Sequence, residues 1–214
     1  LVFCNTKEDV RQVCAYLNRH GVQALALHGD LEQRDRNQVL VQFRQQSCTI
    51  LVATDVAARG LDISKLGAVI NFDIPRDVDT YIHRIGRTGR GTESGTALTL
   101  VADNEQHRLE RLAHFLEREL STEKLESLAV RHEGFTPPPY ITLEISGGRK
   151  QKVRPGDILG ALTSTGHIDG SSVGKIDVLD YAAFVAIERS LAGQALDSLV
   201  QGKIKGRRLK VRRL

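Results

Sequence analysis

Short apolar runs alternate with amphipathic stretches from Leu1 to about Leu120, and this alternation limits the fold more than any other feature of the chain. The segments between the runs are long enough for crossover helices, so the runs are expected to form strands of a parallel sheet. This pattern predicts a doubly wound α/β domain. The five predicted strands cover residues 1–4, 24–28, 49–53, 68–72 and 96–101.

The first helix is predicted directly after the first strand. Val10, Val13, Cys14 and Leu17 have the spacing of one helical face. Thr6 followed by Asp9 resembles a capping box at the start of this helix, and Gly21 is expected to end it.

A second, smaller domain is predicted after a Gly-Phe-Thr-Pro-Pro-Pro connector at residues 134–139, because proline cannot donate hydrogen bonds to a strand ladder. We therefore expect a domain over residues 1–121, a linker over 122–139 and a domain over 140–214, called the tail below. The tail has the βαββαβ order of a small α+β domain that resembles an RNA-recognition motif. Its predicted elements are strand 140–146, helix 155–163, strands 174–179 and 183–187, helix 191–201 and strand 208–212.

Positive charge is concentrated in the tail. Residues 140–214 contain 13 Lys and Arg against 7 Asp and Glu, a net charge of +6, whereas residues 1–139 have a net charge of −2. A local excess of this kind favours polyanions through counterion release, although surface cations also serve solubility. Charge alone therefore does not establish nucleic-acid binding.

Cys4, Cys14 and Cys48 are far apart and lack C-x-x-C spacing, so no metal site is predicted. A reducing cytoplasm is the expected compartment. No apolar run is long enough for a membrane span, and no secretory leader is present within these bounds. Because the sequence opens on the strand-like residues 1–4 without an initiator Met, we expect it to begin inside a larger protein.

Polar residues follow three of the predicted strands: His28 to Asp30, Thr54 with Asp55, and Asn71 to Asp73. In a doubly wound sheet the carboxyl ends of the strands form one rim, where ligands bind. Each of these residue types also commonly caps helices or forms turns. Their shared place on one rim is what favours a functional interpretation.

Two longer motifs indicate phosphate chemistry. The motif His-Arg-Ile-Gly-Arg-Thr-Gly-Arg spans residues 83–90, and Val-Ala-Thr-Asp-Val-Ala-Ala-Arg-Gly-Leu-Asp spans residues 52–62. A guanidinium group is permanently charged and matches phosphate oxygens. However, the sequence contains no G-x-x-x-x-G-K-[ST] phosphate loop, and no Asp-Glu pair stands where a magnesium-binding motif is expected. The chain is therefore expected to complete an ATP site that another domain supplies.

Residues 1 to about 120 resemble the second RecA-like domain of DEAD-box RNA helicases. The resemblance rests on Phe-Cys-Asn-Thr at residues 3–6, on Gln33 and Arg36 after His-Gly-Asp, and on the two longer motifs, all in family order and spacing. It implies ATP with Mg²⁺ as the nucleotide, held mainly by the absent first domain. Arg87 and Arg90 would act as catalytic residues on its β- and γ-phosphates, Asp62 and Gly60 would contact the nucleotide, and His83 would couple the domains. Arg84 is interpreted as structural.

The same resemblance implies an RNA-backbone groove. An acceptor such as Asp55 or Asp30 would take a 2′-hydroxyl proton and thereby favour RNA over DNA. The implied groove residues are Gly29, Asp30, Gln33, Arg36, Thr54 and Asp55.

The tail resembles the RNA-binding domain of a bacterial DEAD-box subfamily, through Gly-Gly-Arg-Lys at residues 147–150, the segment 153–162 and the segment 202–207. This resemblance implies a large-subunit ribosomal RNA hairpin as the partner. Tyr181 and Phe184 lie three residues apart and would face opposite sides of a regular strand, so stacking on the sheet is not the expected mode. The expected RNA contacts are instead Arg149, Lys150, Lys152, Arg154, Lys203, Lys205, Arg207 and Arg208.

Together these features predict the C-terminal half of an ATP-dependent RNA helicase that acts in large ribosomal subunit assembly, inactive by itself. Two alternatives stay open at this point: a DNA-remodelling helicase domain and a non-enzymatic RNA-binding adaptor. A phosphate loop and an Asp-Glu-Ala-Asp motif encoded upstream of Leu1 would favour the helicase, and their absence would favour the adaptor.

Overall fold

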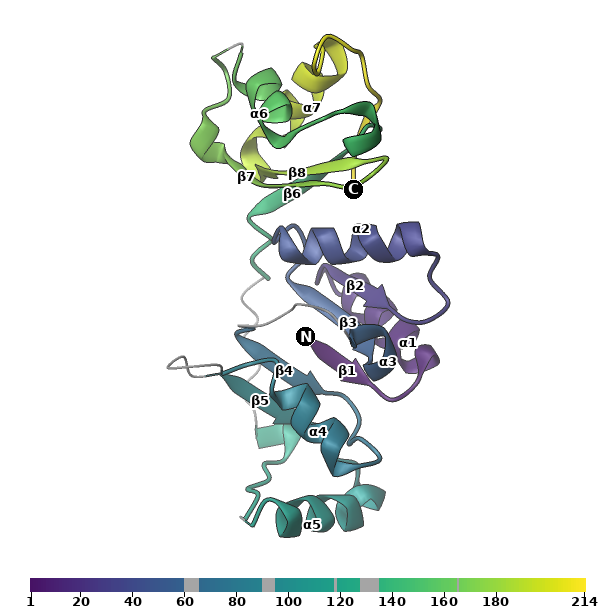
Figure 1. Cartoon of the computed structure of the whole chain (residues 1–214). Helices are drawn as coiled ribbons and strands as arrows, with labels where there is room; N and C mark the ends of the chain where they lie inside the picture. Colours follow the sequence, from purple (N-terminus) through teal and green to yellow (C-terminus); the bar gives the residue numbers. More distant parts are fainter. Residues whose placement is uncertain (60–65, 90–94, 118, 128–134, 165) are drawn as a thin grey trace. The chain divides into compact units, whose positions relative to one another are not determined.

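The computed structural model divides the chain into two compact units, which are described separately. Unit 1 comprises Leu1–Leu31 and Ile50–Thr136, and unit 2 comprises Glu32–Thr49 and Pro137–Leu214. The structure describes all residues except 60–65, 90–94, 118, 128–134 and 165 (Figure 1). The domain ranges expected from the sequence, 1–121, 122–139 and 140–214, remain a prediction.

Unit 1 contains a five-stranded parallel sheet with the strand order β2-β3-β1-β4-β5, which confirms the predicted fold class. The central strand β1 pairs on both sides, with Val2 opposite Val52 and opposite Ile70. The strands are β1 (Val2–Cys4), β2 (Ala24–Leu27), β3 (Ile50–Thr54), β4 (Ala68–Asn71) and β5 (Thr96–Thr99).

Helix α1 (Lys7–Arg19) packs against this sheet as its apolar spacing predicts. Val10 is fully buried, and Val13, Cys14 and Leu17 pack against the same core cluster. The Thr6 hydroxyl accepts a hydrogen bond from the Asp9 amide at 3.1 Å, so Thr6 is the N-cap. The other helices of unit 1 are α3 (Asp55–Ala58), α4 (Val78–Ile85) and α5 (Gln106–Phe115), with 3₁₀ turns at Asp103–Glu105 and Leu125–Ser127.

The tail folds in the predicted βαββαβ order around an antiparallel sheet with the strand order β7-β8-β6-β9. The last strand begins later than the expected residue 208, because the chain turns at Lys205 and Gly206, whose φ angles are 51° and 76°. The strands are β6 (Tyr140–Ile145), β7 (Val173–Val178), β8 (Ala183–Glu188) and β9 (Val211–Arg213), and the helices are α6 (Pro155–Thr163) and α7 (Ala192–Gln201). Three 3₁₀ turns lie at Arg149–Gln151, Gly170–Ser172 and Arg189–Leu191.

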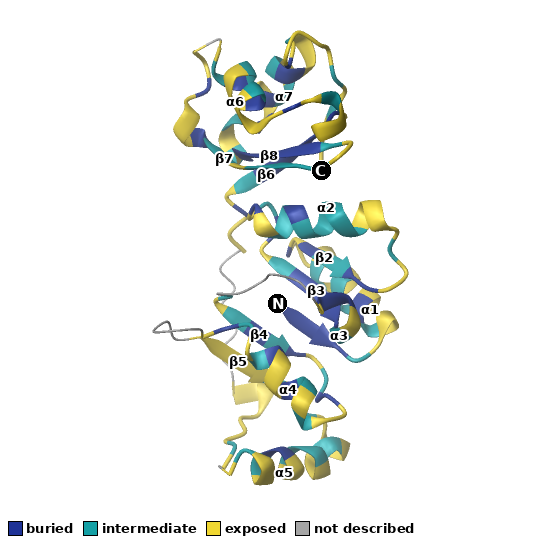
Figure 2. Ribbon diagram, in the orientation of Figure 1, coloured by how far each residue is buried: buried dark blue, intermediate teal, exposed yellow. Residues whose placement is uncertain are grey.

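One face of the tail sheet forms the hydrophobic core with α6 and α7 (Figure 1). Leu143 and Ile145 of β6 and Val185 of β8 are fully buried on this face. Because side chains alternate along a strand, Thr142, Glu144 and Phe184 point to the opposite face. These three are buried as well, and Figure 2 shows most of β8 in the dark blue of buried residues.

Helix α2 (Gln33–Arg44), which belongs to unit 2, covers that opposite face. Gln45 at its end donates to Asp177 Oδ2 at 2.9 Å and to the Phe184 carbonyl at 3.3 Å, and its own Oε1 accepts from the Thr142 hydroxyl at 2.9 Å. Gln38 donates to Glu144 Oε1 at 3.1 Å. The sheet of the tail is therefore covered on both faces within unit 2.

Across the residues that the structure describes, no helix is long and apolar enough to cross a membrane.

Candidate nucleic-acid interface

The strands of unit 1 present their carboxyl ends on one rim, as the parallel register requires. The polar residues that follow the strands at this rim are Asn5 after β1, His28 after β2, Asp55 after β3 and Asp73 after β4. The rim is thus built from four segments that are far apart in the sequence, and the polar residues singled out by the sequence come together there.

Arg84 of α4 joins these segments. Its side chain is 1% exposed and forms a two-pronged ion pair with Asp55, with Nε to Oδ1 and Nη2 to Oδ2 both at 2.7 Å. It also donates to Asn5 Oδ1 at 2.9 Å, to the Asp73 carbonyl at 3.0 Å and to Asn71 Oδ1 at 3.3 Å. All five guanidinium hydrogens therefore have acceptors, which fits a structural role.

Asp55 has two different sides. Arg84 binds both of its oxygens from the interior, while 25% of the Asp55 side chain stays exposed. A carboxylate offers about four lone-pair directions, so acceptor capacity remains on the exposed side. The guanidinium charge offsets the carboxylate charge at the same time, which permits this acceptor to lie near a phosphate.

Asp30 is committed to two cations at the surface. Lys7 Nζ and Arg11 Nη2 each lie 2.7 Å from one of its carboxylate oxygens. The hydrogen bond from Lys7, helped by the one from Arg11, lowers the pKa of Asp30 below its ordinary value. The neighbouring His28 is buried, which lowers its pKa, and its Nδ1 has no hydrogen-bond partner among the described residues.

Thr54 and Gly29 have simpler surroundings. The Thr54 hydroxyl accepts a hydrogen bond from the Ala57 amide at 3.4 Å and caps α3. Thr54 is 9% exposed. Gly29 is exposed, and a Cβ atom added there would meet nothing within 4 Å. Its glycine identity is therefore not required by packing in this structure.

The predicted nucleotide contacts are described only in part. His83 is exposed on α4, and Arg87 is partly exposed directly after the helix ends at Ile85. Gly60, Asp62 and Arg90 lie outside the described residues. Gln33 and Arg36 belong to α2 in unit 2, where Gln33 donates to Asn37 Oδ1 at 2.9 Å.

The structure brings the two basic segments of the tail together. Lys205 Nζ donates to the Lys152 carbonyl at 2.8 Å and lies 4.0 Å from Asp157 Oδ2. These contacts tie residues 203–208 to residues 149–154, so the predicted cations form one surface. Each of the eight is exposed: Arg149, Lys150, Lys152, Arg154, Lys203, Lys205, Arg207 and Arg208.

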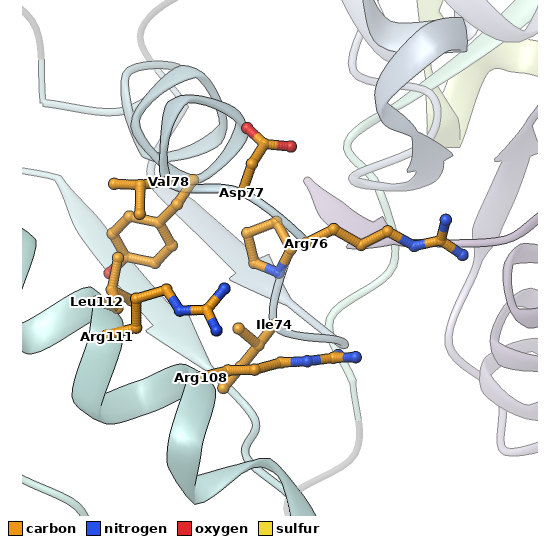
Figure 3. Close-up of a pocket in the computed structure, with 9 residues that line it drawn as sticks. Ile74, Arg76, Asp77, Val78, Arg108, Arg111 and Leu112 are labelled. Atoms are coloured by element: carbon orange, nitrogen blue, oxygen red, sulfur yellow. The ribbon is translucent and has the colours of Figure 1, made fainter.

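A small cavity between residues 74–77, α4 and α5 does not belong to this interface. Figure 3 shows arginines Arg76, Arg108 and Arg111 around an apolar floor that includes Ile74 and Leu112. Its volume is about 20 Å³, which is room for about one water molecule, so it cannot hold a nucleotide. No group of three His, Cys, Asp or Glu that could hold a metal ion is found among the described residues.

Sequence reasoning missed two features of the site. It did not identify Asn5 as a hydrogen-bond acceptor for Arg84, although Asn5 lies in one of the motifs on which the resemblance rests. It also treated Tyr181 as a residue of the same strand as Phe184, which was wrong, because Tyr181 lies before β8 and is 70% exposed, while Phe184 on β8 is 2% exposed. A polar residue directly after a buried strand and an aromatic residue beside an aspartate in a turn were the available signals.

Two family models match separate parts of the chain. The helicase conserved C-terminal domain matches residues 1–92, and the DbpA RNA binding domain matches residues 142–213. The first match lies within the predicted RecA-like region, and the second lies within the tail.

Curated relatives match along the whole chain. The ATP-dependent RNA helicase DbpA of Escherichia coli is 46% identical over 100% of this chain and 46% of its own length. The Bacillus subtilis protein of the same name is 30% identical over 99% of this chain and 48% of its own length. The chain therefore spans about half the length of these relatives.

Solved structures agree on the fold. A chain of the E. coli DEAD-box protein SrmB, crystallised with regulator of ribonuclease activity A, is 35% identical with a TM-score of 0.56, and the match covers 63% of this chain and 79% of that one. A DEAD-box protein from Methanococcus jannaschii is 39% identical with a TM-score of 0.52 over 55% of this chain and 32% of that one.

Proposed function

Because this chain belongs to the DEAD-box family of RNA helicases, we propose that it serves as the C-terminal half of an ATP-dependent RNA helicase of the DbpA type. Its tail binds a large-subunit ribosomal RNA hairpin, and the enzyme remodels short duplexes nearby during assembly of the large ribosomal subunit in the cytoplasm. The observation that carries the proposal is the union, in one chain, of a helicase C-terminal domain with a tail whose two basic segments form one surface.

In this proposal ATP with Mg²⁺ is bound mainly by a preceding domain, and this chain supplies the second wall of the cleft. Arg87 and Arg90 lie on the phosphates, Asp62 and Gly60 contact the nucleotide, and His83 couples the two walls. Positioned arginines of this type contribute roughly 10³- to 10⁵-fold in rate to phosphoryl transfer. The exposure of His83 and the partial exposure of Arg87 are compatible with these roles. The chain alone is expected to be inactive, and measurable ATP turnover by it would contradict the proposal.

Single-stranded RNA is proposed to run along the rim of unit 1. Gly29 and the exposed side of Asp55 are accessible there, and Asp55 is the better acceptor for a 2′-hydroxyl because Asp30 is already bound by two cations. Thr54 is the remaining proposed backbone contact of unit 1, and Gln33 and Arg36 of unit 2 are each proposed to contact the RNA backbone as well.

The test measures binding of the chain to a large-subunit ribosomal RNA hairpin and to an unrelated hairpin of equal length, at several salt concentrations. The ribosomal hairpin is expected to bind more tightly at physiological salt. Affinity should fall steeply with salt, because each phosphate contact releases counterions. Replacing Arg149, Lys150 and Lys152 together by Ala should weaken binding and reduce the logarithmic salt slope by about 0.9 for each phosphate that is no longer neutralised.

A matched control removes three exposed cations from unit 1 instead, namely Arg19, Arg76 and Arg111. This variant loses the same charge and is expected to retain the preference for the ribosomal hairpin. Equal affinity of the native chain for the two hairpins would refute the proposed specificity. If both triple variants lose the same affinity, the basic surface of the tail contributes only general charge attraction and no specific recognition.

A further inference from the structure

The tail has three Phe or Tyr side chains, and only one of them is available to a ligand in unit 2. Phe184 is 2% exposed on the sheet face that α2 covers. Tyr140 is half-buried and lies so close to Gly174 that a Cβ atom there would be 3.1 Å from its ring. Tyr181, in contrast, is 70% exposed. If an RNA base stacks on an aromatic ring of the tail, Tyr181 is therefore the ring that is exposed to it, and the rings on the sheet are not.

Tyr181 lies in a turn that a backbone hydrogen bond closes. The turn connects β7 to β8 and is closed by a hydrogen bond from the Leu179 amide to the Ala182 carbonyl at 2.8 Å.

The same turn is attached to the first basic segment by two backbone hydrogen bonds. The Arg149 amide donates to the Leu179 carbonyl at 2.8 Å, and the Lys150 amide donates to the Asp180 carbonyl at 2.9 Å. Gly148 makes this approach possible, because a Cβ atom at that position would lie 2.1 Å from the Leu179 oxygen. The exposed ring and the two exposed cations therefore lie on two backbone segments that are hydrogen-bonded to each other.

We propose that Tyr181 is a stacking platform for an unpaired base of the RNA that the tail binds, with Lys150 and Arg149 on the adjoining phosphates. The proposal rests on the RNA-binding function proposed above and names the part of the RNA that this edge recognises. Aromatic stacking and phosphate contacts occur side by side in single-stranded RNA recognition. Lys150 has no carboxylate partner among the described residues, and Arg149 has only a 4.0 Å approach to Asp180, so both charges are available to phosphate.

The test uses the full chain and two RNAs: a large-subunit ribosomal stem-loop, and a blunt duplex with the same stem. Tyr181→Ala is expected to weaken binding of the stem-loop by about 5- to 150-fold, the range for loss of one stacked base. Tyr181→Phe keeps the ring and should bind within about threefold of the native chain. Binding of the blunt duplex should not change, because it offers no unpaired base. The logarithmic salt slope should also stay constant in Tyr181→Ala, because no cation is removed.

A fluorescence measurement gives an independent readout. The chain contains no Trp, so Tyr181→Trp introduces a single reporter, and stacking on a base should quench it when the stem-loop is added. The matched control is Tyr16→Trp on α1, where the native ring is 61% exposed in unit 1 and no quenching is expected.

The outcomes separate the two proposals. If the native chain fails to bind the stem-loop, the proposed RNA-binding function fails, and the role of Tyr181 fails with it. If the native chain binds while Tyr181→Ala binds equally well, only the stacking role is overturned. Equal weakening of stem-loop and duplex binding would likewise overturn it, because the ring would then act on the fold rather than on an unpaired base.

Discussion

Replacing Arg84 by Gln is expected to destabilise unit 1 more than any other single change at the rim. The native side chain is 1% exposed and donates to Asp55, Asn5, Asn71 and the Asp73 carbonyl. Glutamine has no charge and is too short to reach all four partners. Their oxygens would then lack donors, which water can replace only where the site is open.

The magnitude follows from the burial of the pair. Removing one partner of a buried ion pair costs about 3–5 kcal/mol, because the remaining charge is left without compensation. Asp55 is 25% exposed, so water can reach part of its carboxylate, and the lower end of that range, about 3 kcal/mol, is expected. Such a loss is a large share of a typical domain stability of about 5–15 kcal/mol.

Native-state hydrogen exchange read by mass spectrometry measures this loss in one unit at a time. The slowest amides of β1, β3 and β4 should exchange about 100-fold faster in Arg84→Gln, whereas peptides from the tail serve as an internal reference and should not change. Arg84→Lys keeps the charge but lacks the planar fork, so an intermediate effect is expected. A loss below about 1 kcal/mol in Arg84→Gln would refute the reasoning, since a buried pair worth so little does not hold four segments together.

Two further outcomes are expected. Gly148→Ala should destabilise the tail by about 1–3 kcal/mol in the same exchange experiment, because the added Cβ would lie 2.1 Å from the Leu179 oxygen; Gly156→Ala, where nothing lies within 4 Å, is the matched control, and equal stability of the two variants would contradict the steric argument. Carboxyl NMR should show Asp30 titrating below its ordinary pKa of about 3.9, so its stabilising contribution is complete above that pH and is lost as the pH falls through the lowered value; Lys7→Ala should move the pKa of Asp30 upward, and an unchanged titration would argue against the Lys7 hydrogen bond.

The strands of unit 1 could be predicted because parallel strands buried on both faces produce continuous apolar runs. Leu51, Val52 and Ala53 of β3 are fully buried and show this directly. The rim could be predicted for a related reason. Once the strands are parallel, the residues after each carboxyl end share one edge, whatever loop lies between them.

The covering of the tail sheet could not be predicted in the same way. Thr142 and Glu144 alternate with the apolar residues of β6, which is the pattern of a strand with one solvated face. Both are buried in unit 2, at 1% and 6% exposure, where Gln45 accepts a hydrogen bond from Thr142 and Gln38 donates one to Glu144. Alternation identifies the two faces of a strand but does not reveal which polar partner covers the second one.

The difference between Arg84 and Arg87 has a similar origin, since one motif supplies both residues. Tyr81 is buried on α4, and Arg84 follows it by three residues, so the helical period returns Arg84 to the same inward face. Arg87 lies past the end of the helix at Ile85, so the helical repeat no longer determines the direction of its side chain. The motif gives the residue type, and the point at which the helix ends decides which arginine returns to the buried face of α4.

This division also explains how a carboxylate can serve at an RNA-backbone site. An isolated Asp55 would repel the phosphates that the rim is proposed to bind, and burying its charge without a partner would be costly. Arg84 balances the charge from the interior and leaves the exposed side of the carboxylate as an acceptor. The buried arginine thus joins Asp55 to the neighbouring segments of the rim through hydrogen bonds between 2.7 and 3.3 Å.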